Sequence, residues 1–203
     1  MSQMKTYGSK LNAVEMQDFL DYAITQNVRT SQQSKKGVRG TPICIWGTHG
    51  IGKTQSVIDF ARRHDYTYVY CAPAQFEEVG DLHGIPETYD PTPEMPNNGD
   101  EYTVYRPPQW LHSALSNADS TKPGLLILDD FNRAEPRILQ SCMQLLQMHA
   151  LFSWELPQNW QIVLTANPEG GSYSVNEMDD AMLTRMLHVT MEFDVECWAK
   201  WAI

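Results

Sequence analysis

The chain has 203 residues, of which 42% are hydrophobic and 20% are charged, and its formal net charge is −10. This length suits one domain with a sizeable core, and the composition is ordinary for a globular protein. The negative charge argues against a broad nucleic-acid-binding or anionic-membrane-binding surface, because both kinds of surface are basic.

The lack of a targeting signal and the spacing of the cysteines predict a cytoplasmic location. The first ten residues lack the apolar core of a signal peptide, and no run of about 18 apolar residues is present. The four cysteines form no C-x-x-C pair and have no histidine at metal-ligand spacing. We interpret them as small buried apolar residues in a reducing compartment: Cys44, Cys71, Cys142 and Cys197.

The first 40 residues are expected to form a helix and a loop that lead into the core at residues 41–203. Apolar residues at helical spacing predict a helix over residues 13–26. The polar sequence of residues 29–40 predicts a solvated loop.

Five short apolar runs then alternate with helical or polar sequence. Such a pattern predicts parallel strands buried on both faces and joined by crossover helices, hence an α/β fold with a central sheet of about five strands. The runs are residues 42–46, 66–71, 124–130, 161–167 and 187–193.

Three helices are predicted between these strands. Two cover residues 53–64 and 134–149, and Ser174 to Glu177 resembles a capping box that opens a short helix reaching residue 186. Residues 86–108, rich in Pro, Asn, Gly and Asp, are an insertion that such a fold does not need. The buried stripe expected on the helix at 134–149 consists of Ile138, Leu139, Cys142, Leu145, Leu146 and Met148.

A glycine-rich loop lies between the first core strand and its helix. The sequence GTHGIGKT has the spacing G-x-x-x-x-G-K-T, which predicts a loop whose backbone N–H groups hold the phosphates of a nucleotide. Lys53, expected to face solvent, would reach the β- and γ-phosphates, and the Thr54 hydroxyl would bind Mg²⁺. The predicted binding residues are Gly47, Thr48, His49, Gly50, Ile51, Gly52, Lys53, Thr54 and Gln55.

Two further strands end in polar side chains. Because parallel strands bring their C-terminal ends to the ligand crevice, Asp129 is predicted to hold Mg²⁺ and Asp130 to polarise the attacking water. Asn167 follows the next strand and is predicted to orient water beside the γ-phosphate. His49 is interpreted as a loop residue, not a catalytic base.

At this point the chain resembles a known family. The segments GTHGIGKT, LLILDDFNRAEP, LTANP and DDAMLTRM follow one another as in AAA+ ATPases of the MoxR type, and APAQFEEVGDLHGIPE and FDVECWAKWA also resemble that group. The resemblance implies a RecA-like αβα three-layer P-loop fold and ATP hydrolysis with Mg²⁺. It also implies assembly into a ring, typically a hexamer, that remodels a protein client, often with partners that carry a von Willebrand factor A domain.

The resemblance also implies roles for single residues. Asn167 matches the sensor-1 position, and Arg185 matches the arginine finger that completes a neighbour's site. Arg133 is a second candidate for the subunit boundary. The insertion at 86–108 would be a pore or partner element.

Two departures from the family pattern predict altered behaviour. Asp130 stands where the family usually has Glu, and its shorter side chain predicts slow hydrolysis. The chain ends at Ile203, directly after the last predicted strand, so the helical lid is expected to be absent.

Three functional hypotheses remain open at this stage. The first is a MoxR-type ATPase, and the second is a nucleotide-dependent switch that scarcely hydrolyses ATP. The third is a small-molecule phosphotransferase, which would need an acceptor pocket with a base and an arginine-rich lid. The order of Asn167 and Arg185 speaks against the third.

Overall fold

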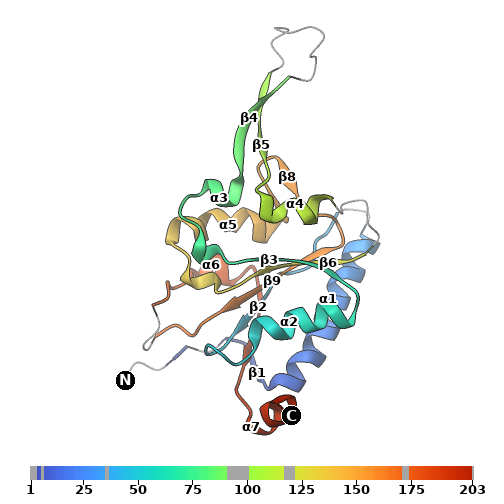
Figure 1. Ribbon diagram of the computed structural model, residues 1–203, viewed down its shortest axis with the longest axis vertical. Helices are drawn as coiled ribbons and strands as arrows, with labels where there is room; N and C mark the ends of the chain where they lie inside the picture. The colour runs from blue at the N-terminus through green and yellow to red at the C-terminus, as the bar shows by residue number, and fades with distance from the viewer. Residues whose placement is uncertain are drawn as a thin grey trace.

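The computed structural model describes residues 4–5, 7–34, 37–90, 101–116, 122–170 and 174–202. Its centre is a parallel sheet of six strands in the order β1-β10-β2-β9-β6-β3 (Figure 1). The strands are β1 (Ser9–Leu11), β10 (Leu187–Met191), β2 (Ile43–Trp46), β9 (Trp160–Ala166), β6 (Gly124–Leu128) and β3 (Thr67–Cys71).

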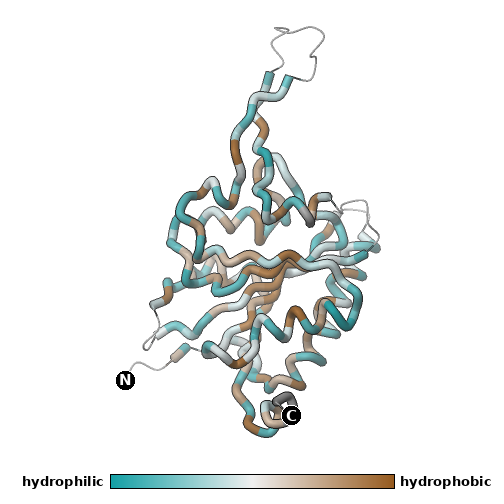
Figure 2. The backbone as a smooth tube through the Cα atoms, in the orientation of Figure 1, coloured by the Kyte–Doolittle hydropathy of each residue, from teal (hydrophilic) through white to brown (hydrophobic). Residues whose placement is uncertain are grey.

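All five predicted strands are present, and β1 adds a sixth at the edge of the sheet. Strands β2, β6 and β9 are buried along their whole length, which explains why they are uninterrupted apolar runs. Figure 2 shows the hydrophobic residues concentrated along these central strands. The three residues of β1 are too few and too polar to show a strand pattern in the sequence.

Helices cover both faces of the sheet, so the predicted three-layer arrangement is confirmed. Helices α1 (Ala13–Gln33) and α2 (Lys53–Arg63) contribute to one hydrophobic cluster with the sheet. Helices α4 (Gln109–Ser116) and α5 (Pro136–Met148) contribute to the cluster on the other face (Figure 1).

Helix α1 is longer than predicted. It begins at a capping box in which Asn12 Oδ1 accepts from the backbone N–H of Glu15 at 3.0 Å while Glu15 Oε2 accepts from the backbone N–H of Asn12 at 2.9 Å. Val28 and Ser31 continue its buried stripe to Gln33. The expected loop at 29–40 was therefore wrong for residues 29–33, because polar residues on the exposed face hid the helical period.

Helices α2 and α5 confirm their predictions with one exception. The expected stripe of α5 is buried except for Met148, which is 57% exposed. Met148 is the last helical residue, and the chain turns into a left-handed conformation at His149, so Met148 points away from the core. Three cysteines are buried as expected, whereas Cys197 is only half-buried.

The segment before the last strand also differs from expectation. Ser174 to Glu177 does not open a helix, because the Asn176 backbone N–H instead donates to the Asn132 carbonyl at 2.8 Å. The helix there, α6 (Asp180–Leu183), has Asp179 as its N-cap. A further helix, α7 (Val195–Ala202), follows β10, so the chain does not end directly after the last strand.

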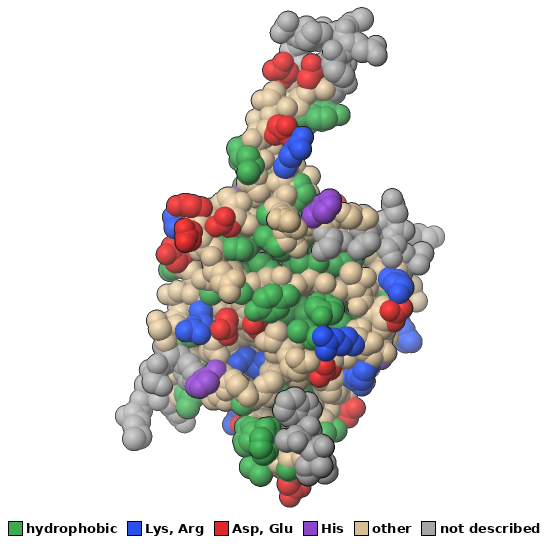
Figure 3. Space-filling view, in the orientation of Figure 1, with side chains coloured by type: hydrophobic (Ala, Val, Ile, Leu, Met, Phe, Trp, Pro, Cys, Tyr) green, Lys and Arg blue, Asp and Glu red, His purple; other side chains and the backbone are tan. Residues whose placement is uncertain are grey.

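The insertion forms an antiparallel hairpin that projects from the body of the molecule (Figure 1). Its strands are β4 (Ile85–Tyr89) and β5 (Tyr102–Arg106), and residues 91–100 between them lie outside the described residues. Ile85, Tyr89 and Tyr102 are exposed, and Figure 3 shows hydrophobic and acidic side chains along this projection. Other short elements are η1 (Pro73–Gln75), α3 (Gly80–His83), β7 (Ala150–Leu151) and β8 (Trp154–Glu155), the last two forming an antiparallel pair.

None of the helices that the structure describes is long and apolar enough to cross a membrane.

His149 is an unusual member of the core. Its side chain is buried, and neither ring nitrogen has a hydrogen-bond partner among the described residues. Burial, with a smaller contribution from the nearby Arg39 charge, lowers the pKa of His149 to about 4. Because the folded pKa lies below the unfolded value, the neutral form is the one that folding favours.

We therefore expect stability to fall as the pH drops below about 6.5 toward 4. From pH 7 to pH 5, His149 should cost about 2 kcal/mol of unfolding free energy. His149→Asn, which tolerates the left-handed backbone, should remove that part of the pH dependence. Urea unfolding at both pH values measures this, and equal pH slopes for the two proteins would contradict the assignment.

Candidate functional site

The loop between β2 and α2 is shaped by glycines. Gly52 has a φ of 90° and is the N-cap of α2, a left-handed conformation that other residues rarely adopt. A Cβ at Gly47 would lie 2.7 Å from the Met191 carbonyl oxygen and 2.8 Å from Ile51 Cδ1. The two glycines thus let the chain turn tightly and begin a helix whose first N–H groups face the loop.

Lys53 lies beneath this loop. Its Nζ donates to the carbonyl oxygens of Gly47 at 2.8 Å and Thr48 at 2.9 Å, and to Asn167 Oδ1 at 3.2 Å. The side chain is 7% exposed, so the expected solvent-facing position was wrong. Burial lowers the pKa of Lys53, and the charges of Asp130 and Asp129 oppose this effect.

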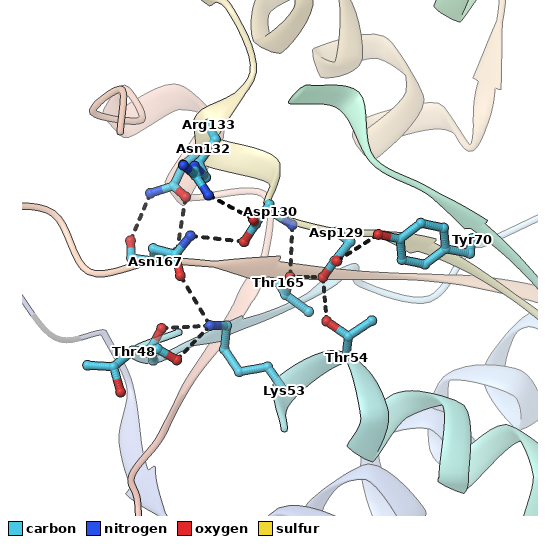
Figure 4. Close-up of polar contacts among 11 residues, drawn as sticks. Thr48, Lys53, Thr54, Tyr70, Asp129, Asp130, Asn132, Arg133, Thr165 and Asn167 are labelled. Carbon is cyan, nitrogen blue, oxygen red and sulfur yellow. Dashed lines mark hydrogen bonds and ion pairs between the residues drawn. The ribbon is translucent and has the colours of Figure 1, made fainter. Parts of the chain in front are cut away.

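Asp129 follows β6 and accepts hydrogen bonds from three hydroxyl groups (Figure 4). Its Oδ1 accepts from Thr54 Oγ1 and, at 2.6 Å, from Thr165 Oγ1. Its Oδ2 accepts from the Tyr70 hydroxyl at 2.9 Å. Thr54 and Asp129, predicted as partners from separate segments, are therefore in direct contact.

Asp130 has a left-handed backbone with a φ of 50° at the start of η2 (Phe131–Arg133). Its Oδ1 accepts from Asn167 Nδ2 at 2.9 Å, and its Oδ2 lies 3.4 Å from the Arg133 guanidinium. The carboxylate thus lies between the end of β9 and the turn that follows Asp130 itself.

Asn167 links Lys53 to Asp130 and is itself held by a second amide. The Asn167 backbone N–H donates to Asn132 Oδ1 at 3.0 Å, and Asn132 Nδ2 donates to the Asn167 carbonyl at 2.8 Å. Both side chains are buried. This mutual pairing fixes the side-chain amide of Asn167 between an ammonium and a carboxylate.

The donor set suits Mg²⁺. Thr54 and Asp129 supply hard oxygen atoms, and Mg²⁺ typically takes one or two such protein ligands together with phosphate oxygens and water. Across the described residues, no group of three or more His, Cys, Asp or Glu side chains is placed to hold a metal alone.

A pocket of about 950 Å³ adjoins the glycine loop. Its walls come from the start of α1, the loop at 50–52, α2, and the segment from Met191 to Trp198, and they are mostly apolar. A pocket of this volume beside the glycine loop has room for a nucleobase and sugar.

The remaining predicted residues are Arg185, Arg133, His49 and Gln55. Arg185 donates through Nε to Gln147 Oε1 at 3.2 Å and also to the Ala181 carbonyl, beside a separate pocket of about 400 Å³. Arg133 is exposed and is paired with its own Asp130. In the glycine loop, His49 is exposed, and Gln55 donates to Asp59 at 2.6 Å.

Sequence reasoning missed Tyr70, Thr165 and Asn132. Thr165 lies on β9, two residues before Asn167. Tyr70 lies near the end of β3, which is paired with β6. Polar residues near the ends of neighbouring strands are the signal that would have found the first two.

Comparisons with known proteins identify the family and the fold. A family model described as "AAA domain (dynein-related subfamily)" matches residues 42–186. A search of the curated proteins gave no match. A solved structure described as a "putative ATPase" from Cytophaga hutchinsonii is similar in fold, with a TM-score of 0.54 and 16% identity. The match covers 93% of this chain and 52% of that one, so the chain spans about half of that protein's length. The chain belongs to the AAA domain family, dynein-related subfamily.

Proposed function

We propose that the chain is an ATP-binding and ATP-hydrolysing module of MoxR type that works in a ring to remodel or activate a protein partner. The observation that carries the proposal is the contact of Lys53, Thr54, Asp129, Asp130 and Asn167 at the C-terminal edge of the sheet. Side chains from three separate segments meet there, as ATP hydrolysis requires.

Lys53 is the proposed phosphate ligand. Its buried ammonium already donates to the loop carbonyls, and it would exchange some of these bonds for the β- and γ-phosphate oxygens. Thr54 and Asp129 would hold Mg²⁺, Asp129 through water. A metal ion there supplies positive charge that neutralises the phosphates in the transition state.

Asp130 and Asn167 are the proposed water-directing pair. The Asn167 amide would orient the attacking water without neutralising Lys53, and the Asp130 carboxylate would polarise it. Arg185 is assigned to a neighbour's nucleotide, since its hydrogen bonds in the described structure go to Gln147 and Ala181 and not to its own glycine loop.

The ring and its client are the broader part of the proposal. A hexamer and a client, including a protein with a von Willebrand factor A domain, are proposed from the MoxR resemblance. The projecting strands β4 and β5 are the element we assign to client contact, because Ile85, Tyr89 and Tyr102 are exposed on them.

A nucleotide-dependent switch is the second candidate. It is favoured by the contacts that hold Asp130 to Asn167 and Arg133, because a carboxylate so engaged is less available to a water. Phosphate release from Mg²⁺-ATP separates the two: sustained turnover supports the ATPase, and binding without turnover supports the switch.

We expect Asp130→Ala to bind Mg²⁺-ATP normally and to lose turnover by about 100-fold, the usual contribution of a catalytic base. Asp130→Glu should raise turnover severalfold if reach limits the reaction. Phosphate release measures both, with Glu78→Ala as an exposed-carboxylate control. If neither Asp130 variant changes the rate, another group polarises the water.

A further inference from the structure

Tyr70 contacts the candidate site although no sequence motif includes it. Its hydroxyl donates to Asp129 Oδ2 at 2.9 Å, as Figure 4 shows. The ring is 46% exposed, so it contributes little to the core. The exposure and the directed hydrogen bond together suggest a role in the site and not in packing.

Sheet register explains why the two residues meet. Strands β3 and β6 are parallel neighbours in which Tyr70 pairs with Ile127 and Cys71 pairs with Leu128. The Asp129 backbone N–H then donates to the Cys71 carbonyl at 2.8 Å, which continues the pairing beyond the strand. The Asp129 backbone is thereby fixed beside Tyr70, and the orientation of its carboxylate remains to be set by side chains.

The two carboxylate oxygens of Asp129 have different surroundings. Oδ1 accepts from Thr54 and Thr165, whereas Oδ2 accepts from Tyr70. The bond at Oδ2 adds a second point of attachment, which restricts rotation of the carboxylate about the Cβ–Cγ bond. A ligand's outer-sphere hydrogen bonds commonly set its orientation toward a metal in this way.

We infer that Tyr70 is a positioning residue that holds the Asp129 carboxylate in the orientation needed for Mg²⁺ bound with a nucleotide. The inference rests on the proposed function, because it assigns Asp129 to the metal. Tyr70 does not bind the nucleotide itself in this scheme, so its effect is confined to the part of nucleotide affinity that depends on Mg²⁺.

Tyr70→Phe tests the inference, because it removes the hydroxyl and retains the ring. The probe is N-methylanthraniloyl-ADP, whose fluorescence reports binding without turnover, titrated with MgCl₂ or in EDTA. We expect the Mg²⁺ concentration for half-maximal binding to rise about tenfold, in line with losses of outer-sphere partners. Affinity in EDTA should stay within about twofold of the wild type, since only the metal-linked part changes.

Tyr68→Phe is the matched control. Tyr68 lies two residues earlier on β3, on the same face, and packs against the hydrophobic cluster that α1 and α2 form with the sheet. The Tyr68→Phe variant should leave the Mg²⁺ dependence of binding unchanged. That result would show that removing a tyrosine hydroxyl from this strand is not by itself enough to weaken Mg²⁺-dependent binding.

Three results would overturn the inference. If wild-type binding responds to Mg²⁺ and Tyr70→Phe shows the same Mg²⁺ dependence, the positioning role of Tyr70 is rejected and the proposed function is not. Equal weakening in MgCl₂ and EDTA identifies a structural role. A wild type that does not bind the probe, or binds it without regard to Mg²⁺, rejects the proposed function itself and the inference with it.

Discussion

Replacing Lys53 with methionine is expected to weaken Mg²⁺-ATP binding about 1,000-fold, corresponding to about 4 kcal/mol, while the chain stays folded. Lys53 supplies a buried positive charge close to Asp129 and Asp130, and two phosphates would add further negative charge there. Without the ammonium, the phosphates would meet two carboxylates and no compensating cation. Methionine is preferred to alanine because the side chain is buried and its stem fills space.

Calorimetric titration with ATP in MgCl₂ measures this effect. Lys122→Ala is the control, because Lys122 is an exposed lysine paired with Asp65 on the surface. A melting temperature close to that of the wild type would confirm that Lys53→Met is folded. A folded Lys53→Met that binds ATP as tightly as the wild type would show that the glycine loop is not the phosphate site.

Arg185→Ala is expected to leave nucleotide affinity nearly unchanged and to reduce turnover of the assembled protein about 1,000-fold, as loss of an arginine finger does. The reason is geometric. Arg185 follows α6 and contacts Gln147 on α5, beside a pocket that Arg39 and Glu155 also line. Its charge therefore belongs to a surface distinct from its own glycine loop, where a neighbour's phosphates would meet it.

A mixing experiment distinguishes a shared site from a local defect. Assemblies of Arg185→Ala subunits and Lys53→Met subunits should recover part of the turnover, because some boundaries pair an intact loop with an intact arginine. Sedimentation must first confirm that the rings form, and Arg29→Ala provides an exposed-arginine control on α1. Normal turnover by assembled Arg185→Ala, or no recovery on mixing, would contradict a shared site and favour the switch.

Much of the fold was predictable because its signals are local. Buried parallel strands such as β6 and β9 are uninterrupted apolar runs, and the glycine loop has a specific spacing. Helix ends were less predictable, because contacts with distant residues compete with local capping. The Asn176 backbone N–H donates to the Asn132 carbonyl, and Asp179 caps α6 in place of Ser174.

The candidate site was predictable only in part. Asp129, Asp130 and Asn167 follow apolar strands, and that position alone places them at one edge of the sheet. Tyr70 and Thr165 lie within strands, so their approach to Asp129 depends on the register between β3, β6 and β9. Register between strands far apart in the chain is not encoded in any short motif. The burial of Lys53 was missed for a related reason, because Asn167 and the folded loop cover it from outside its own helix.

Hydrogen exchange followed by mass spectrometry, with and without Mg²⁺-ATP, tests most directly whether this cluster binds the nucleotide. Protection is expected in peptides that contain residues 47–55, with smaller protection over residues 129–133 and 165–167, where Asp129, Asp130 and Asn167 adjoin the loop. Protection in the glycine loop that disappears in Lys53→Met is the result that we predict. No protection of residues 47–55 at saturating Mg²⁺-ATP, or protection confined to other parts of the chain, would contradict the assignment of the site.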